Sequence, residues 1–177
     1  MSVKVRPTAR FNRRVLAQRM DAPVLADAAR ALLVTHAISA IVTAGSSAHL
    51  GVLGLLLLRR GAAPAKLVRM HVRITTVGYA LTFMLGSLAY PAFRILIRGY
   101  YLDRYEPWAS NAFDMKEAFL LLGIPVVAGI AIVGRSFELP RDRPAALLLG
   151  VLGTAIALIV VTAAVLGIVV TSVKGPR

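Results

Sequence analysis

The chain has 177 residues, 58% of them hydrophobic, and a mean hydropathy of +0.73. Its 21 Lys and Arg against 8 Asp and Glu give a formal net charge of +13. It has no cysteine, which excludes disulfides, iron–sulfur clusters, thiolate zinc sites and cysteine catalysis.

Four long stretches without a charged residue dominate the sequence: 31–58, 74–93, 118–134 and 144–173. A helix needs roughly 20 apolar residues to cross the hydrocarbon core of a bilayer. Backbone polar groups in lipid must be paired within their own segment, and these stretches lack the alternation of barrel strands, so they should be helical. The sequence therefore predicts an all-α integral membrane four-helix bundle.

The charged residues lie almost entirely between or outside these stretches. Residues 1–26 form a basic amino-terminal arm, and residues 27–177 form one four-helix transmembrane domain. Membrane topology and anionic lipid headgroups explain this distribution of Lys and Arg more simply than nucleic acid does. We therefore expect the lipid bilayer as a partner, and no nucleic acid.

The first two helices should be antiparallel neighbours. They are expected at about 27–58 and 65–98, and the short basic loop "RRGAAPAK" joins them. Pro64 suits the first turn of the second helix, because the missing N–H of proline has no partner there in any case. Pro91, inside the second helix, predicts a kink.

An aromatic, polar segment separates the second and third helices. Three of the five tyrosines and the only tryptophan fall within 100–108, and such side chains favour the membrane interface. Asn111 and Asp114 resemble a helix-start cap, so the third helix is expected at about 111–134. The fourth is expected at about 144–173. Its small residues suit close helix contact and are Gly150, Gly153, Ala157 and Ala164.

The orientation follows from the distribution of basic residues. If the amino terminus is inside, 13 Lys and Arg lie on the inner side and 8 on the outer side. An excess of these residues marks the cytoplasmic side. We therefore expect both termini to be cytoplasmic.

Histidines accompany hydroxyl side chains on the first two helices. At 1.5 Å per residue, His49 and His71 lie about 15 Å and 10 Å from the shared loop, so they can approach similar depths on facing helices. Two facing histidines can bind the iron of heme b through neutral ring nitrogens. Arg69 and Arg73, which flank His71, could then pair with the heme propionates.

A structural interpretation fits the same residues. Arg69 and Arg73 would lie at the headgroup level with their stems along the apolar surface. His36, toward the other end of the first helix, could face Asp114 and Glu117 in a proton relay. The alternative is an interfacial His36, with the two carboxylates complementing the amino-terminal dipole of the third helix.

Two segments carry a resemblance to known proteins. The stretch 90–117, "YPAFRILIRGYYLDRYEPWASNAFDMKE", resembles small bacterial inner-membrane proteins with four helices. The first-helix segment "THAISAIVTAGSSAHL" resembles the histidine-bearing first helix of cytochrome b561-type and copper-resistance membrane proteins. The resemblance implies an inner (plasma) membrane location and, at most, one heme, since the third and fourth helices contain no histidine.

These observations favour a small polytopic membrane protein that is an accessory or structural subunit without a catalytic centre of its own. Its partners would be other membrane subunits or further copies of the chain, through the small-residue faces. The first alternative is a membrane electron carrier that binds heme b through His49 and His71. The second is a small transporter or proton-conducting protein.

Overall fold

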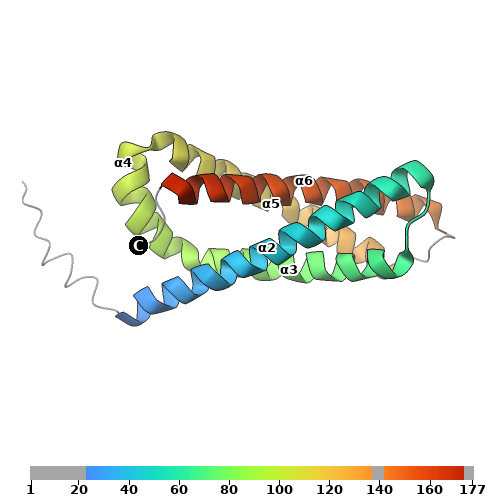
Figure 1. Cartoon of the computed structure of the whole chain (residues 1–177), viewed down its shortest axis with the longest axis horizontal. Coiled ribbons are helices and arrows are strands. Elements are labelled where there is room, and N and C mark those ends of the chain that lie inside the picture. Colours follow the sequence, from blue (N-terminus) through green and yellow to red (C-terminus); the bar gives the residue numbers. More distant parts are fainter. Residues whose placement is uncertain (1–22, 137–141, 174–177) are drawn as a thin grey trace, which may run out of the picture.

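The computed structural model describes residues 23–136 and 142–173, and the predicted all-α fold is confirmed over these residues. The remaining residues, which include most of the predicted amino-terminal arm, lie outside the described part. Within it the chain forms long helices and no strand (Figure 1). The long helices are α2 (Pro23–Arg60), α3 (Ala65–Phe93), α5 (Pro107–Ser136) and α6 (Arg143–Val173).

Each long helix has the length and composition needed to cross a membrane. The qualifying segments are 27 to 31 residues long and correspond to Ala31–Arg60, Ala65–Pro91, Pro107–Arg135 and Arg143–Val173. Their mean hydropathy rises from 1.3 in the α3 segment to 2.7 in the α6 segment. The α3 segment is the most polar because it contains the basic residues that precede Ile74.

The second predicted helix ends earlier than expected, and the predicted loop after it is helical. α3 ends at Phe93, and the chain continues as the π-helix η1 (Arg94–Leu102) and the short helix α4 (Asp103–Tyr105). Pro91 lies inside α3 and cannot donate a backbone hydrogen bond. The change to the wider π pattern follows directly after this interruption.

The third long helix begins four residues before the position predicted for it. α5 starts at Pro107, so the expected cap at Asn111 is wrong, and Asn111 and Asp114 lie inside the helix. The fixed backbone angle of proline suits the first helical position, and this signal outweighed the cap-like Asn111. The change leaves Asp114 free to bond a side chain of η1.

The helices form a ring in which α2 contacts α3 and α6, α5 contacts α6, and α3 contacts α5 less extensively. α2 and α6 meet through glycines, with almost no space between their backbones. A Cβ atom added at Gly54 would lie 2.7 Å from the carbonyl oxygen of Gly150, and one added at Gly51 would lie 2.7 Å from the Cβ of Ala157. Gly153 similarly faces Leu50. The small-residue face predicted on α6 is therefore confirmed at Gly150, Gly153 and Ala157.

The contact between α3 and α5 depends on one aromatic side chain. Tyr79 of α3 is buried, and its hydroxyl donates a hydrogen bond to the backbone carbonyl of Leu120 in α5. Gly123 makes room for this hydroxyl, because a Cβ there would fall within 2.2 Å of it. At the other end of this seam, Val72 of α3 lies against Gly134 of α5.

An arginine fastens η1 to α5. The guanidinium of Arg98 donates two hydrogen bonds to the Asp114 carboxylate, at 2.7 Å and 2.8 Å, and its Nε lies 3.5 Å from Asp103. Asp103 accepts a further hydrogen bond from the hydroxyl of Ser110. The two hydrogen bonds that Asp114 accepts raise the pKa of Arg98 above its ordinary value, so the guanidinium stays charged.

Replacing Arg98 should loosen the contact between η1 and α5 without unfolding the bundle. We expect Arg98→Ala to raise the amide hydrogen-exchange rates of residues 94–105 roughly fivefold, which corresponds to about 1 kcal/mol for a well-formed, partly exposed ion pair. Arg94→Ala removes the same charge from the same segment and should leave these rates nearly unchanged, because Arg94 is exposed. Equal exchange in both variants would contradict the role of Arg98.

Candidate site between α2 and α3

Hydroxyl side chains join α2 and α3 along the face where the two helices meet. Thr82 of α3 lies 2.7 Å from the hydroxyl of Ser39 and 3.2 Å from that of Thr43. Thr43 also donates to the backbone carbonyl of Ser39 at 2.8 Å. Ser39 and Thr43 are buried. In an apolar environment, such polar groups are stable only when they are paired.

One turn closer to the α2–α3 loop, Ser46 bonds His71. The Ser46 hydroxyl lies 3.1 Å from Nδ1 of His71 and 3.0 Å from the hydroxyl of Thr75. Ser46 and Thr75 are buried, whereas His71 is only partly buried. Ser46 therefore fixes the ring of His71 against α2.

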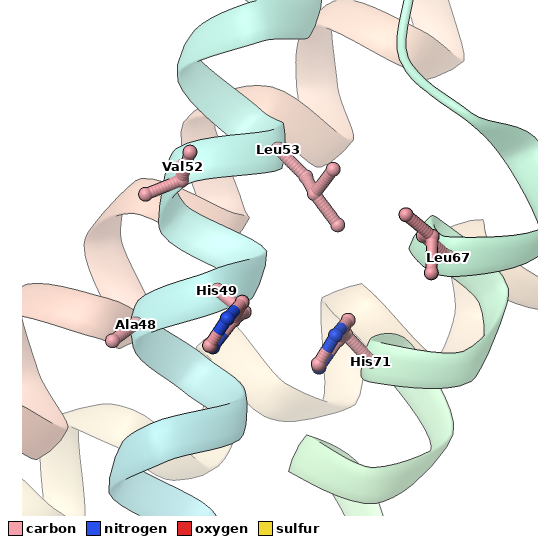
Figure 2. A pocket seen from close by; sticks show the side chains of 6 residues that line it. All are labelled: Ala48, His49, Val52, Leu53, Leu67 and His71. Atoms are coloured by element: carbon pink, nitrogen blue, oxygen red, sulfur yellow. The ribbon is translucent and has the colours of Figure 1, made fainter.

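The two histidines near the loop meet, as their similar predicted depths allow. The rings of His49 and His71 have centroids 5.1 Å apart and planes inclined by 3°, and Figure 2 shows them face to face, from opposite helices. Nδ1 of His49 donates to the backbone carbonyl of Gly45 at 2.9 Å. A carbonyl can only accept, so a neutral His49 carries its proton on Nδ1 and keeps the lone pair of Nε2 available.

The histidine pair borders an open, mostly apolar pocket of about 320 Å³. Its other lining residues are Ala48, Val52 and Leu53 of α2 and Leu67 of α3, all labelled in Figure 2. His49, Val52 and Leu67 are exposed, so the pocket opens on the outer surface of the helix pair.

The geometry of the pair does not match that of two axial heme ligands. The lone pairs of an imidazole lie in the plane of its ring, so stacked rings do not aim their nitrogens at one atom between them. Arg69 and Arg73 are absent from the pocket lining. Each is two residues from His71, which places it about 200° around the helix. Heme ligation would therefore require both imidazole rings to rotate. A heme in this pocket would also have its propionates on the side away from Arg69 and Arg73.

His36 lies at the opposite end of the α2–α3 contact. Its Nδ1 is 3.0 Å from the backbone carbonyl of Thr82, and its ring lies against Gly86, where an added Cβ would come within 3.0 Å. The ring is within electrostatic range of Lys116 on α5. The Lys116 ammonium lies 5.0 Å from the centre of the Phe113 ring.

The structure does not join His36 to the two carboxylates proposed as its relay partners. Asp114 is bonded to Arg98, and no hydrogen bond joins His36 to Asp114 or Glu117 in the described residues. Those residues also contain no group of three or more His, Asp or Glu side chains arranged to hold a metal ion. The polar side chains of α2 and α3 therefore mainly connect the two helices.

Removal of the Ser46 hydroxyl should measure how much this connection stabilises the fold. We expect Ser46→Ala to lower the free energy of unfolding in detergent by about 1 kcal/mol, because interhelical hydrogen bonds in membrane proteins contribute about 0.6–1.7 kcal/mol. Ser172→Ala is the matched control, since the exposed Ser172 bonds only a carbonyl of its own helix. Equal stability of the two variants would show that the Ser46 contacts contribute nothing measurable.

In comparisons with known proteins, the chain matches no family model, no curated protein and no solved structure.

Proposed function

We propose that the chain is an integral membrane protein whose four long helices cross the bilayer, and that it is an accessory or structural subunit without a catalytic centre of its own. The observation that supports this most directly is its outward-facing aliphatic surface. The most exposed large aliphatic residue of each long helix is 67% to 73% exposed: Ile41 on α2, Val77 on α3, Ile132 on α5 and Ile168 on α6. Large aliphatic side chains this exposed on every long helix suit a surface that faces lipid.

The distribution of the polar side chains supports the same proposal. Ser39, Thr43 and Ser46 of α2 are buried and paired with α3. Hydroxyl groups turned inward and paired across helices are the arrangement that a bilayer favours. These hydroxyl groups hold α2 to α3, and this structural role accounts for them without a catalytic centre.

We further propose the bacterial inner membrane as the location, with both termini cytoplasmic. Four crossings put the two termini on the same side of the membrane. The excess of 13 over 8 basic residues then favours the cytoplasm for that side. A reporter active only in the cytoplasm should be active when fused after Arg177 and inactive when inserted between Gly61 and Ala62. The opposite pattern would reverse the orientation.

The accessory role predicts a partner on one outward face of the bundle. Four single tryptophan variants, at Ile41, Val77, Ile132 and Ile168, each place a bulky side chain on a different helix. The membrane-extracted protein should migrate as a complex of fixed composition. The tryptophan on one helix, or on two neighbouring helices, should dissociate this complex. The other variants serve as controls, because a lipid-facing tryptophan is tolerated. A wild-type protein that is monomeric after extraction in mild detergent would contradict the proposal.

A heme-binding electron carrier is the second candidate, and the meeting of His49 and His71 is the observation that favours it. The stacked rings count against it. A reduced-minus-oxidised spectrum of protein purified from heme-replete cells distinguishes the two functions. A b-type band that disappears in both His49→Ala and His71→Ala would establish the carrier, and a colourless preparation would exclude it.

A further inference from the structure

Three arginines from two helices gather at the outer side of the α3–α5 seam. Val72 and Gly134 touch, since a Cβ at Gly134 would lie 2.6 Å from a methyl carbon of Val72. Arg73 follows Val72 and Arg135 follows Gly134 in sequence, and Arg69 is about one turn before Arg73. All three arginines are exposed. Helices advance about 100° per residue, which turns these side chains from the Val72–Gly134 contact toward the outside.

Arg73 and Arg135 also lie at a similar level, and Arg69 is about 6 Å nearer the α2–α3 loop. Arg73 directly precedes the uncharged stretch 74–93, and Arg135 directly follows 118–134. His71 stacks on His49, so the two lie at the same depth. Arg59 is ten residues nearer the α2–α3 loop than His49, and Arg73 is two residues farther from that loop than His71. For parallel helix axes, Arg73 is about 18 Å deeper than Arg59. A bilayer that covers α2 and α6 therefore reaches the level of these arginines.

The site has positive charge but no protein anion to balance it among the described residues. None of Arg69, Arg73 and Arg135 forms an ion pair within residues 23–136 and 142–173. Thr76, one turn beyond Arg73 on the same side of α3, has a buried hydroxyl without a hydrogen-bond partner in that part of the chain. Exposed cations at a membrane boundary suit an anion with several oxygen acceptors.

We propose that Arg69, Arg73 and Arg135 bind the phosphate headgroup of an anionic phospholipid. Each guanidinium group can donate two hydrogen bonds to two oxygens of one phosphate. Below the arginines, the outer side of the seam presents the exposed side chains of Ala80 on α3 and of Ile124 and Ala128 on α5, against which an acyl chain can lie. This proposal rests on the proposed membrane location of the chain.

The test measures lipid affinity of the full chain in nanodiscs of neutral phosphatidylcholine, to which phosphatidylglycerol is added, with bound lipid counted by native mass spectrometry. The wild-type protein should retain phosphatidylglycerol in preference to phosphatidylcholine. One arginine near a membrane surface contributes roughly fivefold to affinity, so the combined Arg69→Gln, Arg73→Gln and Arg135→Gln variant should lose roughly a hundredfold. Arg135→Gln alone, the variant to use if the combined one does not fold, should lose roughly fivefold.

A charge-matched control distinguishes a specific lipid-binding site from a general electrostatic attraction of the basic protein to anionic lipid. The combined Arg59→Gln, Arg60→Gln and Lys66→Gln variant removes three charges from the same end of the molecule and should keep the phosphatidylglycerol affinity within roughly fivefold. An equal loss in both variants would overturn the proposal, and so would displacement of the lipid by inorganic phosphate. If the wild-type chain enters neutral nanodiscs without preferring phosphatidylglycerol, only the lipid site fails. If it does not enter them, the membrane proposal fails.

Discussion

Gly54→Ala should destabilise the bundle by about 2–3 kcal/mol, as expected for a side chain forced into a filled helix contact. The added Cβ would lie 2.7 Å from the carbonyl oxygen of Gly150 and 3.4 Å from its Cα, and both are backbone atoms. Neither can move aside as the tip of a side chain can. α2 and α6 would have to separate, and the buried contacts around Leu50, Leu57 and Leu149 would loosen with them.

Gly45→Ala is a closely matched control, because it makes the same change in the same helix where no atom lies within 4 Å of the added Cβ. It should be neutral or stabilising by up to about 1 kcal/mol, since alanine favours a helix more than glycine does. The measurement is a denaturing-detergent titration followed by circular dichroism. If Gly54→Ala and Gly45→Ala change the unfolding midpoint equally, the close α2–α6 contact is not present.

Gly123→Ala should cost about 2 kcal/mol by displacing a buried tyrosine. The new Cβ would lie 2.2 Å from the hydroxyl oxygen and 2.8 Å from Cζ of Tyr79, a rigid ring held in the core. Moving the ring also breaks its hydrogen bond to Leu120, one of the few polar contacts between α3 and α5. The same titration measures the loss.

A double-mutant cycle isolates the contact between Gly123 and Tyr79. Tyr79→Phe alone should cost about 1 kcal/mol for the lost hydrogen bond. It also removes the atom nearest the added methyl group, so Gly123→Ala should be less harmful in the Tyr79→Phe background than in the wild type. Strictly additive losses would mean that the two residues do not touch.

Hydrophobicity and segment length were enough to predict the number and approximate position of the long helices, because an uncharged stretch of about 20 residues allows few alternatives. The helix ends were less predictable. Asn111 has the chemistry of a cap, but Pro107 starts the helix and Asn111 lies within it. The π-helix Arg94–Leu102 could not be predicted, since it depends on tertiary contacts, such as the bond between Arg98 and Asp114, as well as on Pro91.

The candidate site was predictable in its pairing but not in its orientation. Residue counts from the shared loop predicted that His49 and His71 can approach similar depths, since the rise per residue fixes depth on neighbouring helices, and the two rings do meet. They could not predict that the rings would stack, because this depends on side-chain rotation and on the bonds to Gly45 and Ser46. Nor could they predict that α3 and α5 meet at Val72 and Gly134, the residues that precede Arg73 and Arg135, because this contact depends on the tertiary packing.

Alkaline carbonate extraction of cell membranes is the most direct test of whether these helices lie in lipid. The treatment strips proteins that are only attached to the membrane surface and leaves those whose helices cross it. The full chain should stay in the membrane pellet at alkaline pH and enter solution only with detergent, because its exposed aliphatic residues have no other favourable environment. Release into the carbonate supernatant without detergent would contradict the membrane assignment and, with it, the proposed lipid site.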